Sequence, residues 1–276
     1  MNVRSCLLAA QRELEQAGVP DARVDSGLML AHILRRSRLE VLARSDELLT
    51  QPQIAAFEQL LSRRKTREPL QYILGETGFM GHRFLTRPPV LIPRADTEAL
   101  TQQALARLTP GCRALDLCTG SGAVAISLAL GCPGAQLEGS DISREALDLA
   151  QENAALNGAK VIWHLGDLLS PFAGRRFDMI CCNPPYIPAG YLAELQAEVR
   201  FEPRLALDGG EDGLSFYRRL IAQAPALLPP GGWLLLEVGD GQMGAVRALA
   251  QIDFDHLGVY DDGGGLQRVL AAQRKG

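Results

Sequence analysis

Residues 114–122 read Ala114-Leu115-Asp116-Leu117-Cys118-Thr119-Gly120-Ser121-Gly122, and the apolar segment 123–130 follows them without a break. A short apolar run, a glycine-rich turn and a longer apolar run predict a strand, a tight loop and a buried helix. Gly120 and Gly122 allow the backbone to approach a ligand closely and place that ligand against a helix N-terminus. The loop by itself is also typical of an ordinary turn between a strand and a helix, so its function depends on what surrounds it.

Strands and helices alternate on both sides of this loop. Besides the strand at 114–117, apolar runs predict strands at residues 136–140, 161–164, 179–182 and 233–238. Helical periodicity predicts helices at 97–108, from 123 onward and at 144–157. Such alternation predicts an α/β fold with a doubly wound, Rossmann-like parallel sheet, whose ligands bind at the carboxyl ends of the strands.

The first 70 residues differ from the rest because they read as helix throughout. One helix has a clear start, with Thr50 at the N-cap and Gln53 at the capping-box position. From residue 71 to residue 93, short apolar runs are broken by glycine and proline, which predicts a linker that contains a β-hairpin. We therefore expect a small all-α helical bundle at 1–70, a linker at 71–93 and the α/β domain at 94–276.

The bulk composition indicates a globular protein of more than one domain. The chain has 276 residues, of which 47% are hydrophobic, enough for a sizeable core. No apolar stretch approaches the roughly 20 residues that a membrane span needs, and the N-terminus lacks a signal-peptide core, so we expect a cytoplasmic protein. The six cysteines show no CxxC spacing, which favours reduced, structural thiols.

Charge is distributed unevenly along the chain. The net charge is −4, which argues against a protein whose main role is to coat nucleic acid. Residues 1–70 carry 11 Lys and Arg against 9 Asp and Glu, whereas the remainder is acidic. Basic side chains gather in two clusters, at Arg35, Arg36 and Arg38 and at residues 63–67. Each cluster is either a solvated face or a patch that docks a partner.

The glycine-rich loop does not match the GxGxxG pattern of dinucleotide sites. The mismatch suits a ligand with a zwitterionic amino-acid tail beside Asp116 and argues against a pyrophosphate. The second strand ends at Ser140-Asp141, about twenty residues after the loop, where a Rossmann-type site places an acid for the ribose hydroxyls. Asp141 is therefore the predicted ribose ligand, although it and Ser143 are both also suited to cap the helix that starts near residue 144.

A third strand leads to Gly166-Asp167-Leu168. If Asp141 binds a ribose, this segment falls where the adenine of the same ligand lies. Asp167 is then suited to accept a hydrogen bond from the adenine amino group, and Leu168 to cover the ring. An acid after a strand is also commonly a helix cap, so Asp167 does not identify a nucleoside by itself.

The most specific element is the fourth strand, which ends in Asn183-Pro184-Pro185-Tyr186. Each proline fixes its own φ and holds the residue before it extended, so the strand exit is rigid. The side-chain carbonyl of Asn183 and the backbone carbonyl of Pro184 then offer two acceptors for the two N–H bonds of an NH2 group. Tyr186 offers a face on which a planar group stacks. A proline-rich strand exit without a function is the alternative, and it explains this combination poorly.

These parts suit methyl transfer to an amide-like nitrogen. An amide nitrogen is a poor nucleophile because its lone pair is delocalised into the carbonyl, so the site has to orient it in line with the sulfonium methyl group of S-adenosylmethionine. Hydrogen bonds accepted by Asn183 and Pro184 help to carry the positive charge that develops on the nitrogen. No metal is expected, because the histidines are scattered along the chain without ligand spacing.

Taken together, the chain resembles the PrmC (HemK) family, which methylates the N5 amide of the glutamine in the Gly-Gly-Gln motif of peptide chain release factors. The resemblance covers nearly the whole length. It is carried by Pro20-Asp21-Ala22-Arg23, Glu68-Pro69-Leu70-Gln71-Tyr72-Ile73, Leu91-Ile92-Pro93-Arg94-Ala95-Asp96-Thr97-Glu98, Asp116 to Gly122, Asn183 to Tyr186, Phe201-Glu202-Pro203-Arg204-Leu205-Ala206-Leu207 and Leu236-Glu237-Val238-Gly239. It implies an S-adenosylmethionine-dependent methyltransferase domain at 94–276, S-adenosylhomocysteine as the product and class I release factors as partners, with no membrane and no direct nucleic acid.

Residue chemistry and the resemblance together predict two sets of site residues. The predicted cofactor ligands are Asp116, Cys118, Thr119, Gly120, Ser121, Gly122, Asp141, Asp167, Leu168 and Asn183. The predicted glutamine-binding residues are Asn183, Pro184, Pro185 and Tyr186, of which Asn183, Pro184 and Tyr186 are also predicted to be catalytic. Cys118 stands where the family usually has glycine, so the first turn of the loop has to suit a residue with a Cβ. Leu168 replaces an aromatic residue that some relatives have.

Three other functions fit parts of this pattern. An adenine-N6 methyltransferase of DNA or RNA would present the same planar NH2 group to residues 183–186, but the acidic balance and the lack of a base-reading domain argue against it. A glutamine methyltransferase of a ribosomal protein would have the same site. An adaptor that only binds S-adenosylmethionine leaves residues 183–186 unexplained. The bundle at 1–70 holds no candidate catalytic group, and we expect it to dock the protein substrate.

Overall fold

A computed structural model describes residues 1–276 as two compact units. The helical unit consists of Met1–Gly75 together with Gln196–Phe201, and the sheet unit consists of Glu76–Leu195 and Glu202–Gly276. The chain therefore leaves the sheet unit once, contributes six residues to the helical unit and returns. None of the helices combines the length and the apolar character that crossing a membrane requires.

The helical unit is built from short amphipathic helices around one apolar core. Its helices are α1 (Val3–Gln16), α2 (Ala22–Leu34), α3 (Arg38–Ala43), α4 (Gln51–Lys65), α5 (Leu70–Leu74) and the 3-10 turn Val199–Phe201. The capping box predicted at Thr50 is present, and a second one starts α3 at Ser37. Leu14, Leu30 and Phe57 are among the side chains that fill the core.

A buried ion-pair cluster ties residues 196–201 to α4. Arg64 is only 4% exposed, and its Nε donates to Asp25 Oδ2 at 2.8 Å while its Nη2 donates to Glu198 Oε1 at 2.9 Å. Arg67 donates to both carboxylate oxygens of Glu198, at 2.7 and 2.6 Å. Although burial opposes ionisation, these hydrogen bonds lower the pKa of Glu198 to about 2. The sequence pattern does not indicate that this segment belongs to the helical unit.

The expectation that residues 63–67 form an exposed basic cluster holds for Arg63 and Lys65 but is wrong for Arg64, and the charges of the cluster are paired with acids. Arg63 pairs with Glu68 at 2.5 Å and Lys65 with Glu13 at 2.8 Å, while Arg64 is buried. The unit's own acids thus neutralise these charges, because a buried guanidinium is stable only when it is paired. Arg36 is likewise paired, with Glu47.

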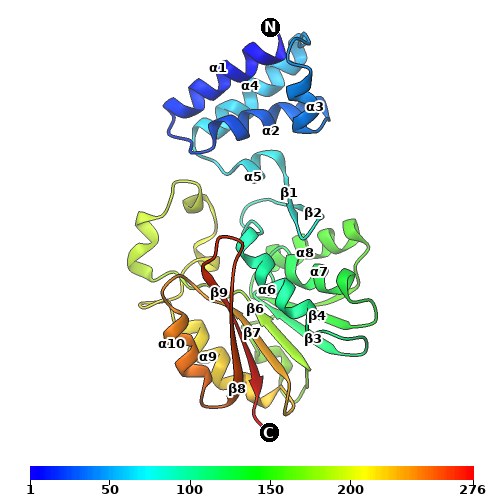
Figure 1. Ribbon diagram of the computed structural model, residues 1–276, viewed down its shortest axis with the longest axis vertical. Coiled ribbons are helices and arrows are strands. Elements are labelled where there is room, and N and C mark those ends of the chain that lie inside the picture. The colour runs from blue at the N-terminus through cyan, green and yellow to red at the C-terminus, as the bar shows by residue number, and fades with distance from the viewer. The chain divides into compact units, whose positions relative to one another are not determined.

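The sheet unit has a seven-stranded sheet with the order β5-β4-β3-β6-β7-β9-β8 (Figure 1). The strands are β3 (Arg113–Leu117), β4 (Gln136–Asp141), β5 (Val161–Leu165), β6 (Met179–Cys182), β7 (Trp233–Glu237), β8 (Phe254–Asp261) and β9 (Gln267–Arg274). The first five are parallel to one another, whereas β9 is antiparallel to β7 and to β8. The predicted doubly wound, Rossmann-like sheet is confirmed, and the antiparallel β8-β9 edge adds to it.

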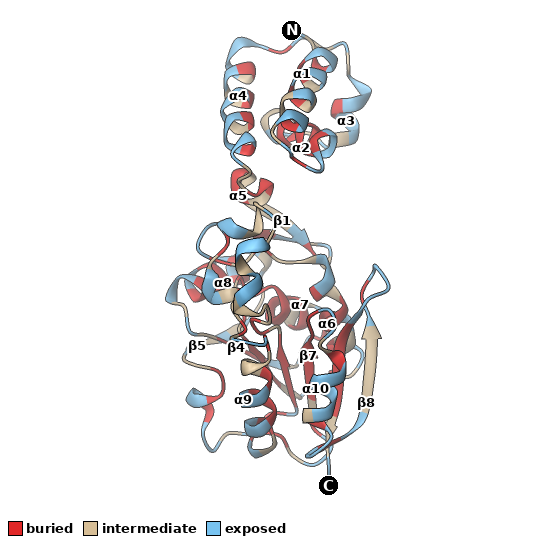
Figure 2. Ribbon diagram, turned by 90° about the vertical axis from the view of Figure 1, so that its left-hand side faces the viewer, coloured by how far each residue is buried: buried red, intermediate tan, exposed pale blue.

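Helices cover both faces of the sheet, so its central strands are buried (Figure 2). The helices of this unit are α6 (Ala95–Leu105), α7 (Ala123–Gly131), α8 (Arg144–Asn157), α9 (Ser215–Gln223) and α10 (Met243–Ala250), with 3-10 turns at Ser170–Phe172, Ala189–Glu194, Arg204–Ala206 and Ala224–Ala226. One core packs α9 and α10 on Ile180 and Leu234, and the other packs α6 and α7 on Cys181 and Leu235. The hairpin β1 (Glu76–Phe79) and β2 (His82–Leu85) precedes α6.

The register of the parallel strands brings their carboxyl ends level with one another. Leu117 of β3 pairs with Ser140 of β4 on one side and with Cys182 of β6 on the other. The residues that follow these three are Cys118, Asp141 and Asn183. Because β3 lies where the strand order reverses, this edge of the sheet is the switch point at which doubly wound folds bind ligands.

Candidate functional site

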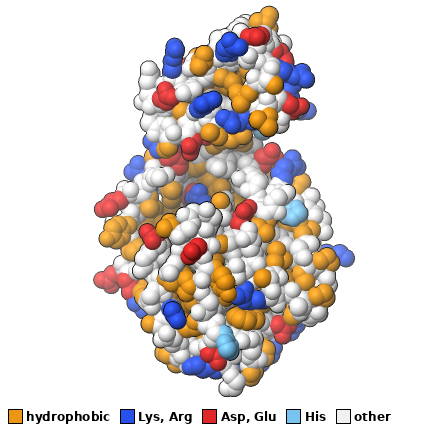
Figure 3. Space-filling view, viewed as in Figure 1, with side chains coloured by type: hydrophobic (Ala, Val, Ile, Leu, Met, Phe, Trp, Pro, Cys, Tyr) orange, Lys and Arg blue, Asp and Glu red, His pale blue; other side chains and the backbone are white.

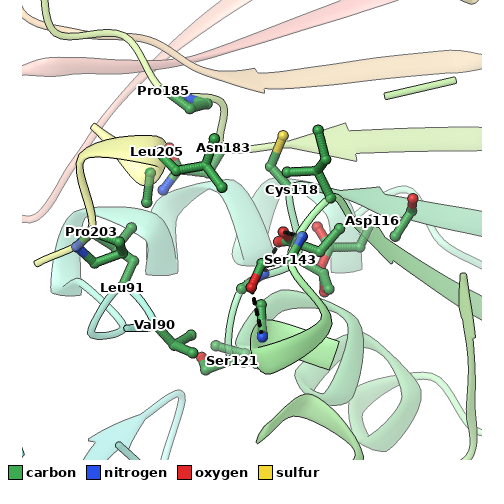
Figure 4. Close-up of a pocket in the computed structure, with 18 of the residues that line it drawn as sticks. Val90, Leu91, Asp116, Cys118, Ser121, Ser143, Asn183, Pro185, Pro203 and Leu205 are labelled. Carbon is green, nitrogen blue, oxygen red and sulfur yellow. Dashed lines mark hydrogen bonds between the residues drawn. The ribbon is translucent and has the colours of Figure 1, made fainter. Parts of the chain in front are cut away.

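A cavity of about 830 Å³ opens at this edge of the sheet. Figure 4 shows Asn183 and Leu205 on one side of it and Cys118, Asp116 and Ser143 on the other. Of the predicted site residues, those that line the cavity are Asp116, Cys118, Thr119, Gly120, Ser121, Asp141, Asp167, Leu168, Asn183 and Pro185. Gly122, Pro184 and Tyr186 do not belong to its wall. The volume is in the range of pockets that hold a nucleoside-sized ligand.

The glycine-rich loop has a left-handed backbone at three places. Gly120 and Gly122 have φ of 54° and 80°, and Cys118 has φ of 55° although it carries a Cβ. The loop therefore keeps the conformation that glycine would favour at position 118, at a cost of about 1 kcal/mol. A Cβ on Gly122 would lie 3.0 Å from Ala150 Cβ and from the Trp163 ring, so the helix that follows packs closely only with glycine there.

Asp116 is buried and forms hydrogen bonds with this loop and with α7. Its Oδ2 accepts a hydrogen bond from Thr119 Oγ1 at 2.5 Å and from the backbone N–H of Ala125 at 3.2 Å. Burial raises the pKa of Asp116 to about 7, against the effect of these two hydrogen bonds, which lower it. The carboxyl is only 2% exposed, so its main visible task is to fix the loop and the first turn of α7.

Asp141 connects the loop to the start of α8. Its Oδ2 accepts from the backbone N–H of Gly120 and its Oδ1 from that of Ser143, both at 2.9 Å. The N-cap of α8 is Ser143, whose side chain accepts from Ala146 N, so Asp141 does not cap this helix. Asp141 also lines the cavity, and its carboxylate has four lone pairs, more than the hydrogen bonds it accepts from the backbone. Burial raises the pKa of Asp141, against the hydrogen bonds from the backbone.

Asp167 and Leu168 follow β5 and line the cavity. Leu168 is buried and has φ of 47°, which turns its side chain into the wall. Asp167 forms an ion pair with Arg219 of α9 at 2.5 Å. Arg219 also lines the cavity, so the charge of Asp167 is largely neutralised, and a ligand there meets a paired carboxylate.

The Asn183 side chain is held in place by α6. Its Nδ2 donates to Thr97 Oγ1 at 3.1 Å. Tyr186 is half-buried and is not part of the cavity lining, its backbone carbonyl accepts from Gln242 Nε2 at 2.9 Å, and its hydroxyl lies 3.5 Å from Glu237 Oε1. Burial and the nearby Glu237 raise the pKa of Tyr186 to about 12. Tyr186 is therefore a neutral phenol fixed at both its backbone and its hydroxyl.

Two further segments complete the cavity, and no role was assigned to them from the sequence. Residues 89–94 and 203–206 supply much of the wall. Glu202 joins them, because its Oε2 accepts from the backbone N–H of Ile92 at 3.1 Å and its Oε1 forms an ion pair with Arg94. Both segments belong to motifs of the family resemblance, Leu91 to Glu98 and Phe201 to Leu207, and that was the only signal for them in the sequence.

Glu237, at the carboxyl end of β7, makes the stability of the protein depend on pH. Burial raises the pKa of Glu237 to about 7, against the Thr97 side chain and the charge of Arg268, which lower it. A carboxyl whose pKa is higher in the folded than in the unfolded chain gives a stabilisation that is complete below the unfolded pKa and is lost as the pH rises through the folded value. Ionised Glu237 is thus the destabilising form.

We expect Glu237→Gln to resist urea better than the parent protein at pH 8 and about equally at pH 4, below the unfolded pKa, since glutamine resembles the protonated acid. Urea unfolding curves at the two pH values measure this. Asp116 has a pKa raised in the same direction, so the parent's loss of stability toward high pH should become smaller in the variant without vanishing. Equal urea midpoints of the parent and the variant at pH 8 would show that ionisation of Glu237 does not destabilise the protein.

Comparisons with known proteins show the family and the fold of the chain. Residues 5–75 match the family model described as the PrmC N-terminal domain, and residues 95–198 match the methyltransferase small domain. A solved 16S rRNA methyltransferase of T. thermophilus, in complex with AdoMet and guanosine, aligns with a TM-score of 0.55 at 21% identity over 72% of this chain and 50% of that chain, which shows a shared fold.

Similarity to curated proteins extends over both units. A protein of Geobacter sulfurreducens named release factor glutamine methyltransferase is 42% identical over 98% of this chain and 96% of its own length. One of the same name from Moorella thermoacetica is 43% identical over 100% of this chain and 99% of its own. The resemblance found in the motifs is thereby confirmed, and the chain belongs to the release factor glutamine methyltransferase family.

Proposed function

We propose that this protein transfers the methyl group of S-adenosylmethionine to the N5 side-chain amide of the glutamine in the Gly-Gly-Gln motif of peptide chain release factors. The observation that carries the proposal is the placement of Asn183 and Pro185 in the wall of the cavity that the glycine-rich loop and Asp141 also line. A nucleoside ligand and a planar amide would then meet in one cavity. Because its substrates act in translation, we further propose that the protein works in the cytoplasm.

The residues of the cavity fit S-adenosylmethionine. Asp141 keeps free acceptor capacity for a ribose diol, and Leu168 offers an apolar surface for adenine. The loop from Cys118 to Gly122 leaves the room beside the N-terminus of α7 that an amino-acid tail needs, since its glycines carry no side chain. When bound, S-adenosylmethionine supplies a methyl group attached to a positively charged sulfur. The sulfur keeps the electrons of the bond that breaks, so the product is S-adenosylhomocysteine.

The protein contributes position and charge stabilisation to the reaction. Asn183 Oδ1 and the backbone carbonyl of Pro184 accept the two N–H bonds of the glutamine amide, which turns the nitrogen lone pair toward the methyl carbon. As the N–C bond forms, the nitrogen becomes positive and both acceptors stabilise it. The extra proton of the methylated nitrogen then leaves to solvent. Tyr186, a neutral phenol, is proposed to pack against the flat amide.

The family membership supports a release factor as substrate over the alternatives. The relatives that cover this chain end to end carry that name, and the helical unit matches a domain description of that family. An adenine-N6 methyltransferase acting on nucleic acid would need a basic surface around the cavity, but the segments around it contribute acids such as Asp167 as well as bases. A ribosomal protein remains the competing substrate, because its glutamine would have the same chemistry.

A transfer assay with a labelled methyl donor tests the proposal. We expect label on purified release factor and none on release factor whose Gly-Gly-Gln glutamine is replaced by alanine. Ribosomal proteins, DNA and RNA serve as competing acceptors in parallel reactions. Labelling of a ribosomal protein or of nucleic acid, with none on release factor, would overturn the proposed substrate while leaving the methyltransferase assignment intact.

Removal of the proposed ribose ligand should weaken cofactor binding. We expect Asp141→Ala to lower the affinity for S-adenosylhomocysteine about 100-fold, since two hydrogen bonds to a charged group contribute roughly 1.5 kcal/mol each. Isothermal titration calorimetry measures the effect. Asp148→Ala, which removes an exposed acid of α8, is the matched control and should bind as the parent does. Unchanged affinity in Asp141→Ala would refute the ribose assignment.

We also propose that the helical unit docks the protein substrate. Because the charges of the cluster at 63–67 are paired within the unit, we place the docking surface on and beside α3. Leu39 and Leu42, three residues apart on this short helix, are 77% and 41% exposed, and Arg35 is exposed just before it. Figure 3 shows orange and blue side chains side by side on this unit. Apolar contact with a basic rim is the usual composition of a docking surface.

A further inference from the structure

A polar chain runs from the cavity wall into the core of the sheet unit. It starts with Asn183, whose Nδ2 donates to Thr97 Oγ1 at 3.1 Å. Thr97 lies in the first turn of α6 and is 6% exposed, and its side chain is close enough to the Glu237 carboxyl to lower the pKa of that carboxyl. The Tyr186 hydroxyl reaches the same carboxyl from the other side, 3.5 Å from Oε1. Asn183 contacts Thr97, which also lines the cavity, and Tyr186 contacts Glu237, so Thr97 and Glu237 lie between the two outer members of the Asn183-to-Tyr186 motif.

The hydrogen-bonding capacities of these groups give the chain a direction. A threonine hydroxyl has one proton, and an amide NH2 group can only donate. Thr97 Oγ1 therefore accepts from Asn183 and keeps its own proton to donate, and the nearby Glu237 carboxylate is an acceptor for that proton. The amide oxygen of Asn183 lies on the opposite side of Cγ from Nδ2. With Nδ2 fixed on Thr97, Oδ1 is turned away from the core.

The Glu237 carboxyl lies near hydroxyl groups and forms no direct ion pair with a cation. It is 1% exposed, and its Oε2 has no hydrogen-bond partner. The nearest cation, Arg268 of β9, is bound to Asp262 at 3.1 Å and lies 3.5 Å from Asp96. A buried carboxyl of purely structural role is normally paired directly with a cation, so the weak compensation here indicates a task other than stability.

We propose that Thr97 and Glu237 are positioning residues for methyl transfer. Glu237 orients the Thr97 hydroxyl, Thr97 fixes the Asn183 amide with its carbonyl toward the substrate nitrogen, and Glu237 also holds the hydroxyl of Tyr186. Without this chain of contacts, the Asn183 amide can rotate by half a turn and present its NH2 group to the substrate. That NH2 group would repel the substrate N–H groups, from which Oδ1 should accept hydrogen bonds. The inference rests on the proposed function, because it assigns Asn183 Oδ1 to the substrate amide.

Substitutions at Thr97 separate its hydroxyl from its volume. Thr97→Val keeps the shape and removes the hydroxyl, and we expect kcat on release factor to fall 10- to 100-fold while the affinity for S-adenosylhomocysteine changes less than threefold. Thr97→Ser restores the hydroxyl and should lose less than threefold in kcat. Thr101→Val is the matched control, because Thr101 is buried on the same helix and its hydroxyl binds only the backbone carbonyl of Thr97.

A double-mutant cycle tests the part played by Glu237. Glu237→Gln replaces one carboxylate oxygen with an NH2 donor and removes the charge, so it is a weaker acceptor for the Thr97 and Tyr186 hydroxyls, which should lower kcat in the parent background. In the Thr97→Val background the same change should have little further effect, since the Thr97 hydroxyl through which it acts on Asn183 is gone. Additive effects of the two substitutions, or a parent-like kcat for Glu237→Gln, would remove Glu237 from the chain.

The orientation of Asn183 can also be observed without turnover. The chain has only four asparagines, so labelling asparagine with nitrogen-15 gives few side-chain amide signals, and loss of one in Asn183→Ala assigns it. We expect this signal to shift in Thr97→Val and to stay close to its parent position in Thr97→Ser and Thr101→Val. An unshifted signal in Thr97→Val, together with a parent-like kcat, would overturn the positioning role. A parent protein that leaves release factor unlabelled, with the shift present, would instead overturn only the proposed function.

Discussion

Replacing Asn183 with alanine should reduce kcat on intact release factor by 100- to 1,000-fold and leave the affinity for S-adenosylhomocysteine within about threefold. The lost carbonyl acts on the substrate nitrogen as it becomes positive, and a single preorganised hydrogen-bonding group of this kind contributes about that factor. Asn183 lines the cavity but is not among the groups that fix the glycine-rich loop, which are Asp116 and Asp141. The loss should therefore appear in the chemical step.

Single-turnover methyl transfer and calorimetric titration measure the two quantities separately. Asn157→Ala is a suitable control, because Asn157 lies at the end of α8, outside the cavity wall, and its amide binds backbone carbonyls. The Asn183 variant should be inactive on all acceptors alike, whether release factor or a short Gly-Gly-Gln peptide. A near-normal kcat would contradict the proposed mechanism, and a parallel loss of cofactor affinity would assign Asn183 to the cofactor instead.

Removing the helical unit should have the second largest effect. Deletion of residues 1–75 is expected to lower kcat/KM on intact release factor about 100-fold or more, which corresponds to roughly 2.7 kcal/mol of docking energy. A glutamine on a flexible loop contributes little binding of its own, so its orientation depends on contacts remote from the reacting atom. Activity on a Gly-Gly-Gln peptide should be poor in both forms and change little. A truncated protein that binds S-adenosylhomocysteine and methylates intact release factor normally would end the docking proposal.

Point variants in the full chain avoid the side effects of truncation, which also strips Glu198 of its partners Arg64 and Arg67. We expect the pair Arg35→Glu and Leu39→Glu to raise KM for release factor with kcat nearly unchanged. The matched pair Leu8→Glu and Arg12→Glu alters a similar exposed leucine and arginine on α1 and should behave as the parent. Equal losses in both pairs would mean that charge in general, and not the α3 surface, controls docking.

The sequence predicts the parallel part of the sheet unit well because each strand there is a short apolar run bounded by glycine, proline or a helix start. The strand Met179–Cys182 and the helix Arg144–Asn157 have the predicted limits. The strand ends also predict which residues gather, since parallel strands bring Cys118, Asp141 and Asn183 to one edge. The structure shows that Ser143 is the N-cap of α8, which spacing alone left open between Ser143 and Asp141, and the role of Asp141 as a ribose ligand stays a prediction.

What the sequence does not predict depends on contacts between distant segments. Polar residues interrupt the apolar ones in the strand Phe254–Asp261, and the strand Gln267–Arg274 has only the four-residue apolar run 269–272 between polar ends. The link from Glu202 to Ile92 and Arg94 spans about 110 residues, and no local pattern marks it. For the same reason Thr97, which reads as an ordinary residue of a helix start, gave no sign of its contact with Asn183.

The discontinuity of the helical unit has a consequence for how the protein is made. Arg64 is neutralised by Asp25 and by Glu198, and Glu198 is synthesised 134 residues after it. The helices at the N-terminus therefore leave the ribosome before their second acid exists, and the unit reaches its final form only after the Asn183 to Tyr186 motif has been translated. A chimera of two family members joined at residue 75 would take Arg64 and Arg67 from one parent and Glu198 from the other, so the exchangeable module has to include residues 196–201.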